Sequence, residues 1–300
     1  MSTILSVFAL LLDQLLGEPR RYHPLAGFGC LAQFTEQQLN RSGAVPLRLM
    51  GLLSVVLLVA PMAVAAQILS DWFGPLFDGI LLYLAVGAKS LAQHALRVVE
   101  ALQRNDLPVA RQRVGMMVSR DTENMERPAI VSATIESVLE NGADAIFGAL
   151  FWFLLAGAPG VVIYRLVNTL DAMWGYRTER FREFGWFVAR LDDLLNWFPA
   201  RLTALVYALA GKFRASIRCW SRQADRLDSP NGGVVMTAGA GALGLILGGP
   251  CSYHGETRDK PFFGAGFSPV CGDIYRAVDL VQKSVLYWVI AILIGGWLFA

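Results

Sequence analysis

The sequence predicts an all-α fold, a polytopic bundle of helices embedded in a membrane. Of its 300 residues, 55% are hydrophobic and 17% are charged, whereas a soluble domain carries roughly 25% charged residues. Apolar stretches of spanning length alternate with two polar segments, residues 119–144 and 168–201. No repeat, low-complexity tract or linker divides the chain, so we expect a single membrane domain over residues 1–300.

The first third of the chain contains three apolar stretches. Residues 3–16 are shorter than the roughly 20 residues that a full span requires, so they form either a thin span or a half-buried helix. Residues 47–69 are the clearest span, and the Gly- and Pro-containing residues 70–79 predict a tight loop after it. A second span starts at Ile80 and continues as an amphipathic helix over residues 89–103.

The first polar segment places three carboxylates on one face of a predicted helix. Ser119 or Asp121 can cap this helix. Glu136, Glu140 and Asp144 follow at intervals of four residues. Like charges at this spacing repel by a few tenths of a kcal/mol, so we expect arginines or a divalent cation to face them.

Residues 145–167 are apolar apart from Arg165, but Gly and Pro residues at 157–160 interrupt them. This interruption predicts a broken helix or a re-entrant hairpin. Interrupted helices at membrane depth occur where they are buried in protein or line a cavity, and their ends offer free backbone groups to ligands.

Three further elements complete the chain. Residues 212–226 predict a basic amphipathic helix. Small residues over 234–249, including Gly244 and Gly248 as a GxxxG pair, predict close packing between helices. Residues 285–299 predict a last, short span.

The second polar segment, residues 168–201, combines polar groups with eight aromatic residues from Trp174 to Phe198. Such a composition suits a membrane–water interface. Its polar residues have helical spacing: Asn168 and Asp171 are three residues apart. Asp192 and Asp193 likewise precede Asn196 by four and three residues, so their oxygens share helix faces.

The distribution of basic residues predicts the orientation of the chain in the membrane. Residues 49–88 contain no Lys or Arg, and none follows Lys283. By the positive-inside rule, both polar segments lie in the cytoplasm together with the amphipathic helices, and residues 70–79 lie outside. We therefore expect a multi-pass protein of the inner (plasma) membrane whose site faces the cytoplasm.

Carboxylates beside arginines suit magnesium and phosphate, because Mg²⁺ takes one or two protein carboxylates and fills its shell with water and phosphate oxygens. A lattice of ion pairs that only ties helices together is the open alternative. The charges form no nucleic-acid-binding stripe, and the sequence has no Walker A, HExxH or GxSxG motif. The predicted metal ligands are Glu136, Glu140, Asp144, Asp171, Asp192 and Asp193, and the predicted anion clamps are Arg120, Arg177, Arg190 and Arg201.

The chain resembles the CobD/CbiB family of cobalamin-biosynthesis membrane proteins, the adenosylcobinamide-phosphate synthases. The resemblance is nearly full length and depends on short motifs in a fixed order. These motifs are Asp13 with Leu16-Gly17-Glu18-Pro19 and His23-Pro24; Ser119-Arg120-Asp121-Thr122; Ile135-Glu136-Ser137 with Glu140-Asn141 and Asp144; Tyr164-Arg165 with Asn168-Thr169-Leu170-Asp171; Gly175-Tyr176-Arg177; Phe184-Gly185; Ala189-Arg190 with Asp192-Asp193 and Asn196; Pro199-Ala200-Arg201; and Ser229-Pro230-Asn231.

The resemblance implies an enzyme that joins (R)-1-aminopropan-2-ol phosphate, or a related aminoalcohol phosphate, to adenosylcobyric acid through an amide. ATP and Mg²⁺ are then expected, the corrinoid is a substrate, and membrane lipid and other late cobalamin-pathway enzymes are candidate partners. We assign catalysis to Glu136, Glu140, Asp192 and Asp193, metal binding to Glu140, Asp144, Asp192 and Asp193, and substrate binding to Arg120, Asp121, Asn168, Asp171, Arg177, Arg190, Asn196, Arg201 and Asn231.

Two alternatives compete with this function. One is a non-enzymatic membrane signalling protein of the AmpE type. The other is a Mg²⁺-dependent membrane phosphoalcohol transferase, whose products would be lipids. CDP-alcohol phosphotransferases place Gly after the second Asp of their first motif, whereas Ala172 follows Asp171 here.

Overall fold

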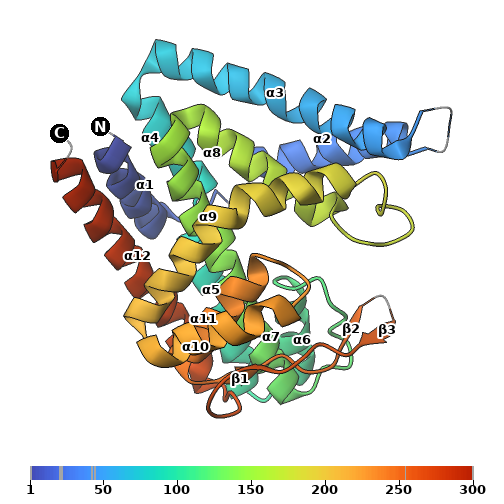
Figure 1. Ribbon diagram of the computed structural model, residues 1–300, viewed down its shortest axis with the longest axis vertical. Coiled ribbons are helices and arrows are strands. Elements are labelled where there is room, and N and C mark those ends of the chain that lie inside the picture. Colours follow the sequence, from blue (N-terminus) through green and yellow to red (C-terminus); the bar gives the residue numbers. More distant parts are fainter. Residues whose placement is uncertain (1, 20–22, 42, 44, 254, 299–300) are drawn as a thin grey trace. The chain divides into compact units, whose positions relative to one another are not determined.

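The computed structural model confirms the all-α membrane architecture (Figure 1). It describes residues 2–19, 23–41, 43, 45–253 and 255–298. Among these residues, four helices are long and apolar enough to cross a membrane by length and composition: Leu47–Phe73, Pro75–Gln103, Arg127–Trp174 and Gly272–Trp297. The chain divides by its internal contacts into unit 1, Met1–Gly87 with Gly148–Asn196, and unit 2, Ala88–Phe147 with Trp197–Ala300.

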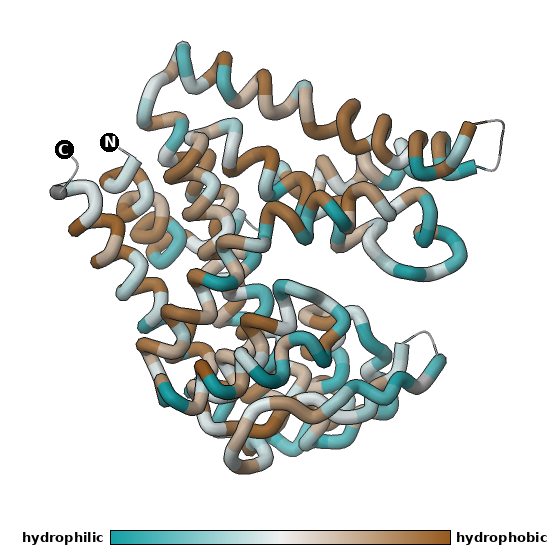
Figure 2. The backbone as a smooth tube through the Cα atoms, viewed as in Figure 1, coloured by the Kyte–Doolittle hydropathy of each residue, from teal (hydrophilic) through white to brown (hydrophobic). Residues whose placement is uncertain are grey.

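Unit 1 is built around α8. Its packing partners are α3 and α4, and α1 packs on α4. The buried faces of α2, α3 and α8 contribute to one apolar core that includes Val55, Leu58, Val167 and Leu170, while α3 is mainly hydrophobic along its length (Figure 2). The helices are α1 (Ser2–Leu16), α2 (Pro24–Leu39), α3 (Leu47–Phe73), α4 (Pro75–Ala85), α8 (Ala149–Trp174) and the first half of α9 (Trp186–Ala210).

Two sequence expectations in unit 1 are wrong. The predicted tight loop over residues 70–79 is limited to one residue, because α3 runs to Phe73 and only Gly74, at φ 70°, leaves helical geometry before Pro75 opens α4. The predicted aromatic surface is partly core: Trp174 and Phe184 are each 1% exposed and pack edge to face with ring centroids 5.1 Å apart. The second error arises because tertiary packing, rather than local composition, decides which aromatic side chains are buried.

The predicted break in residues 145–167 is confirmed as a helical hairpin. Ala156 and Gly157 have non-helical backbone angles, and Gly157 has a φ of 61°, which glycine adopts without a steric penalty. A Cβ at Gly148 would contact the Tyr164 hydroxyl, although a straight helix would separate these residues by roughly 24 Å. The chain therefore reverses direction at the Ala156–Gly157 turn.

Unit 2 packs helices around α11 and carries short strands at its edge. β1 pairs with β4 and β2 with β3, both antiparallel, with Leu247 opposite Phe263 and Ser252 opposite Thr257. The elements are α5 (Ala88–Gln103), α6 (Leu107–Gly115), α7 (Arg127–Gly142), a π-helical turn (Ala143–Gly148), the second half of α9, α10 (Phe213–Gln223), a 3₁₀ turn (Ala224–Arg226), α11 (Gly232–Leu243), β1 (Ile246–Leu247), β2 (Cys251–Tyr253), β3 (Glu256–Arg258), β4 (Phe263–Gly264) and α12 (Gly272–Leu298).

All twelve residues of α11 are buried. Its glycines allow this: a Cβ at Gly239 would collide with Leu139 of α7, and a Cβ at Gly241 with the backbone of α10 at Ala215. The expected close packing is thus confirmed for the helix, but not for the Gly244 and Gly248 pair. Gly244 is the left-handed residue that ends α11, and Gly248 lies beyond it.

Two further boundaries differ from expectation. Neither Ser119 nor Asp121 caps α7, which begins at Arg127 after Glu126 without a side-chain cap. The last helix is longer than the predicted span over 285–299, because α12 already begins at Gly272. The basic amphipathic helix within 212–226 is confirmed as α10.

Candidate functional site

Glu136 of α7 is the centre of a buried polar cluster in unit 2. Its side chain is 1% exposed, yet both of its oxygens are satisfied. Arg120 Nη2 and Lys260 Nζ donate to Oε2 at 2.8 and 2.6 Å. Ser132 Oγ and the Gly248 N–H donate to Oε1 at 2.9 and 3.2 Å. A buried carboxylate with two cations and two neutral donors is stable in its ionised form.

The two cations are themselves nearly buried, with side chains 11% (Arg120) and 16% (Lys260) exposed. Burial lowers the pKa of Arg120, but the adjacent Glu136 carboxylate outweighs this and raises the pKa above its ordinary value. Burial also raises the pKa of the nearby Tyr253 phenol, although Arg120 opposes the shift. The expectation that positive charge faces the α7 carboxylates is therefore confirmed for Glu136.

Glu140, one turn beyond Glu136 on α7, has a different environment. It makes no hydrogen bond or ion pair with the part of the chain that the structure describes, although Lys260, Glu136 and Arg120 act on it electrostatically. Its Oε1 lies against the α carbon of Gly232, where a Cβ would collide with it. The first residues of α11 thus form one wall of the Glu140 environment.

The Ser229-Pro230-Asn231 motif shapes this wall. Ser229 Oγ accepts from the Gly232 N–H at 2.9 Å. Asn231 is 6% exposed and its Oδ1 accepts from Arg201 Nη1 at 3.1 Å. The Arg201 guanidinium also lies over the Trp197 ring at 4.2 Å, and burial lowers the pKa of Arg201. Arg201 and Asn231, both predicted to bind substrate, are therefore in contact.

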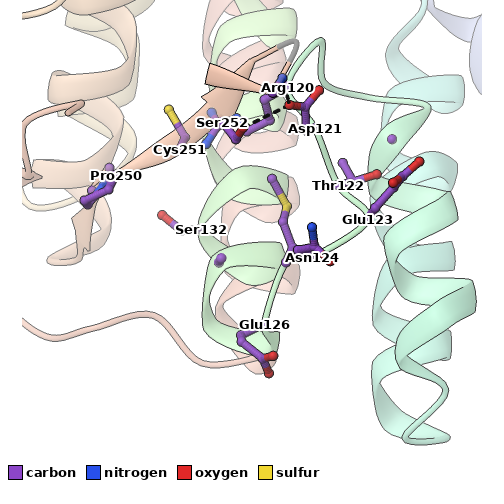
Figure 3. A pocket seen from close by; sticks show the side chains of 16 residues that line it. Arg120, Asp121, Thr122, Glu123, Asn124, Glu126, Ser132, Pro250, Cys251 and Ser252 are labelled. Atoms are coloured by element: carbon purple, nitrogen blue, oxygen red, sulfur yellow. Dashed lines mark hydrogen bonds between the residues drawn. The ribbon is translucent and has the colours of Figure 1, made fainter. Parts of the chain in front are cut away.

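A polar cavity of about 810 Å³ adjoins the Glu136 cluster (Figure 3). Arg120 and Ser132, two of the donors to Glu136, line it, together with the Gly248-Gly249 turn. On the opposite side Glu123 and Glu126 add negative charge, so the cavity presents both signs. Its volume lies in the usual range for small-molecule sites.

Asp121 stabilises one rim of this cavity through hydrogen bonds. Its Oδ2 accepts from Ser252 Oγ at 2.9 Å and from the Gly255 N–H at 2.8 Å, and its own N–H donates to the Ser252 carbonyl. These bonds tie the loop after α6 to the β2–β3 hairpin (Figure 3). Its prediction as a substrate-binding residue stays untested, while its observed contacts hold the rim in place.

In unit 1, the predicted polar residues form a second group centred on Asp192 of α9. Asn168 Nδ2 donates to Asp192 Oδ1 at 3.3 Å, and Asn196 Nδ2 donates to Asp192 Oδ2 at 3.0 Å. Asn196, which is 2% exposed, accepts in turn from the Tyr164 hydroxyl at 2.8 Å. Arg165 Nη1 approaches Asn168 Oδ1 at 3.4 Å. The hairpin of α8 thus meets α9 through a polar network.

The remaining predicted residues of unit 1 lie around Asp193. Arg190 Nη1 is 3.7 Å from Asp193 Oδ2, and Arg177 acts electrostatically on the same carboxyl group. Burial raises the pKa of Asp193, and both arginines oppose that shift. Asp171 lies at the end of α8, where its carbonyl accepts from the Gly175 N–H at 2.7 Å.

Seven of the predicted residues, Arg120, Asp121, Glu136, Glu140, Asp144, Arg201 and Asn231, lie in unit 2, and the other seven, Asn168, Asp171, Arg177, Arg190, Asp192, Asp193 and Asn196, lie in unit 1. Lys260 was missed. It is one of four lysines in the chain, but it stands in a Gly-rich stretch without any periodic pattern. A single lysine among short strands gives no signal in the sequence of a partner 124 residues away.

The predicted metal ligands differ in whether their carboxylate oxygens are free of hydrogen bonds and could bind a metal ion. Among the described residues, no three His, Cys, Asp or Glu side chains converge as an enclosing metal site. Glu136 does not fit as a ligand, because four hydrogen-bond donors already occupy its oxygens. Glu140 does fit the looser requirement of Mg²⁺, which takes one or two carboxylates and completes its shell with water and phosphate. Asp144 lies in the π-helical turn near Tyr207.

These features define a polytopic membrane protein whose unit 2 holds a buried Arg–Lys–Glu cluster beside a polar cavity. The sequence profile described as "CobD/Cbib protein" matches residues 6–281. The chain belongs to the CobD/CbiB family, and this membership indicates a role in cobalamin biosynthesis.

Curated relatives with the name "Cobalamin biosynthesis protein CobD" cover nearly the whole chain. The protein of Stutzerimonas stutzeri is 54% identical and covers 100% of both chains. That of Chromobacterium violaceum is 53% identical over 98% of both chains. That of Mycobacterium tuberculosis is 39% identical over 90% of this chain and 88% of its own. No solved structure matches the chain.

Proposed function

We propose that the chain catalyses the formation of an amide between a carboxylate of adenosylcobyric acid and the amine of an aminoalcohol phosphate, giving adenosylcobinamide phosphate. The usual donor is (R)-1-aminopropan-2-ol phosphate, and ATP supplies the driving force. Family membership and the relatives' names support the pathway. The chemistry of the Glu136 cluster supports the type of reaction.

An amine attacks a carboxylate poorly, because the group that would leave is an oxide. Transfer of the γ-phosphoryl group of ATP to the carboxylate oxygen, with ADP leaving, converts that oxide into a phosphate leaving group. The amine nitrogen then forms the C–N bond, the C–O bond to phosphate breaks, and the nitrogen loses a proton. Anions develop at the carboxylate and phosphate, so fixed cations stabilise this reaction. Mg²⁺ would add charge stabilisation on the phosphates.

The different environments of Glu136 and Glu140 carry the proposal. Both carboxylate oxygens of Glu136 already accept hydrogen bonds from Arg120, Lys260, Ser132 and Gly248. Glu136 therefore positions the cations rather than contacting substrate. Arg120 stands at the cavity wall to meet an anionic oxygen. The Glu140 carboxylate has no hydrogen-bond partner among the described residues. In the proposed reaction it either accepts the proton from the amine or binds Mg²⁺.

The test is turnover by the purified, detergent-solubilised protein with adenosylcobyric acid, aminopropanol phosphate, ATP and Mg²⁺, with the corrinoid product identified by mass spectrometry. Glu140→Gln should lower kcat by at least ~10²-fold, the scale for one lost electrostatic contact in a transition state. Glu256→Gln, an exposed carboxylate on β3, is the matched control and should retain full activity. Undiminished turnover by Glu140→Gln would refute the assigned role.

A genetic test separates this function from its competitors. A cell that lacks the gene should fail to make cobalamin from cobyric acid and should grow when given cobinamide, which bypasses the step. Neither a signalling protein of the AmpE type nor a phosphoalcohol transferase predicts rescue by cobinamide. Growth of the deletion strain on cobyric acid alone would exclude the proposed reaction.

We also propose that the site faces the cytoplasm from the inner membrane. The absence of Lys and Arg from residues 49–88 supports an external turn at Gly74 between α3 and α4. A cysteine introduced at the exposed Asp71, close to this turn, should react with an impermeant maleimide added to intact cells, whereas a cysteine at the exposed Glu123 should react only after lysis. Labelling of the second position in intact cells would overturn the orientation.

A further inference from the structure

Unit 1 contains a second cavity, of about 500 Å³, enclosed by α2, α3, α4 and α8. Its walls are almost wholly apolar, with Phe28, Leu69, Leu81 and Val162 among the lining residues. The cavity opens to the outer surface at Leu31 and Met62, which are 42% and 44% exposed. Three of its four walls belong to helices long and apolar enough to cross a membrane, so its opening faces the region of lipid chains.

Two polar side chains interrupt the apolar lining, and both hold a donor without an acceptor. His23 Nδ1 accepts from the Leu25 N–H at 3.2 Å, which places the ring proton on Nε2. His23 Nε2 and Arg165 Nε are buried and find no hydrogen-bond partner in the described part of the chain. Leaving a buried donor unpaired costs roughly 1–3 kcal/mol, and more for a charged group.

A ligand that satisfies these donors must combine an anionic acceptor with an apolar body. Water alone fits poorly, because apolar cavities remain dry unless several polar groups converge. The Arg165 guanidinium is weakly hydrated and matches a phosphate oxygen geometrically. The apolar walls match a hydrocarbon chain, and the cavity volume lies in the range of small-molecule sites.

We propose that this cavity binds one acyl chain of an anionic phospholipid, with the lipid phosphate accepting hydrogen bonds from Arg165 and His23. The lipid then acts as a structural ligand of unit 1. Arg165 also approaches Asn168 of the Asp192 network, so a bound phosphate fixes the guanidinium that borders that network. This site is independent of the proposed amide-forming reaction.

The experiment is native mass spectrometry of the full-length protein released from detergent with phosphatidylglycerol, phosphatidylcholine or palmitate added separately. We expect one phosphatidylglycerol retained per chain. Arg165→Gln should weaken retention about tenfold, the effect of one lost charge-assisted hydrogen bond. Equal retention of phosphatidylcholine would show that a net negative lipid charge is not selected, and equal retention of palmitate would show that the phosphate is not recognised. Either result would overturn the assignment.

A cavity-filling variant tests the location without touching either polar group. Gly27 lines the cavity, and a Cβ there would meet no atom within 4 Å. Gly27→Leu therefore fits on α2 and places its side chain in the space of the acyl chain, so phosphatidylglycerol retention should be lost. Gly295→Leu is the matched control, since Gly295 is also an open helical position but lines no part of this cavity. Unchanged retention in Gly27→Leu would refute the site even if Arg165→Gln did not fold.

Discussion

Removal of the charge on Glu136 tests whether the unit 2 cluster is a connected network. In Glu136→Gln the side chain keeps its shape, but all four of its present partners are donors. At the Oε2 position the new amide NH₂ group would face Arg120 and Lys260, which can only donate. At the Oε1 position it would face the Gly248 N–H, and the Ser132 hydroxyl is the one partner there that can turn to accept. Arg120 and Lys260 would also lose their common counter-charge while remaining nearly buried.

The magnitude follows from this geometry. Breaking a buried ion pair by neutralising one partner costs roughly 3–5 kcal/mol, because the remaining charge is uncompensated. Lys260→Met alone removes one charged hydrogen bond, worth about 1.5–3 kcal/mol, and leaves Glu136 with Arg120. In the double variant the unpaired cation at position 260 is absent. The two effects should therefore be non-additive by up to about 3 kcal/mol, as expected for residues in direct contact.

Unfolding of the detergent-solubilised protein, followed by tryptophan fluorescence during denaturant titration, measures these differences. Glu256→Gln on the exposed face of β3 is the control and should lie within about 0.5 kcal/mol of the parent. Additive effects of Glu136→Gln and Lys260→Met, or an unchanged stability of Glu136→Gln, would show that the ion pair does not hold the cluster together.

Three further predictions concern local stability. Burial raises the pKa of Glu36, but hydrogen bonds from Arg180 and Asn40 outweigh it and hold the pKa below its usual value. The stabilisation that ionised Glu36 gives should be complete above about pH 4.5 and lost at lower pH. In a series of Tm measurements against pH, Glu36→Gln should therefore show a smaller fall in Tm at acid pH. Gly51→Ala should destabilise by about 1–3 kcal/mol, because its Cβ would collide with a backbone carbonyl, whereas the matched Gly27→Ala should be neutral or stabilising on thermal unfolding. Asp121→Ala should speed proteolysis of the β2–β3 hairpin while leaving global unfolding nearly unchanged, since the Asp121 carboxylate accepts hydrogen bonds from Ser252 and Gly255 of that hairpin.

The features that sequence reasoning predicted depend on local chemistry. The turn at Gly157 was predictable because Gly and Pro disrupt helical geometry wherever they occur in an apolar segment. The demand for positive charge near Glu136 followed from helical spacing and Coulomb repulsion. The basic helix α10 followed from its amphipathic pattern in the same way.

Long-range partners could not be predicted. Lys260 and the Gly248 N–H reach Glu136 from 124 and 112 residues away, and no periodicity links such positions. The strands of two or three residues are too short to show an alternating pattern. From the sequence, Glu136 and Glu140 have the same predicted role. Only the tertiary contacts reveal that the Glu136 oxygens already accept four hydrogen bonds, whereas Glu140 has no hydrogen-bond partner among the described residues.

The complete burial of α11 has a consequence for how this segment can change over time. Most helices have a solvent or lipid face on which substitutions accumulate freely, so tolerated substitutions recur with the 3.6-residue period of the helix. In α11 all twelve residues are buried, and Gly239 and Gly241 contact α7 and α10. We therefore expect no such periodicity here. Enlarging any residue of α11 requires a compensating reduction in a neighbouring helix, so this segment and its partners must evolve jointly.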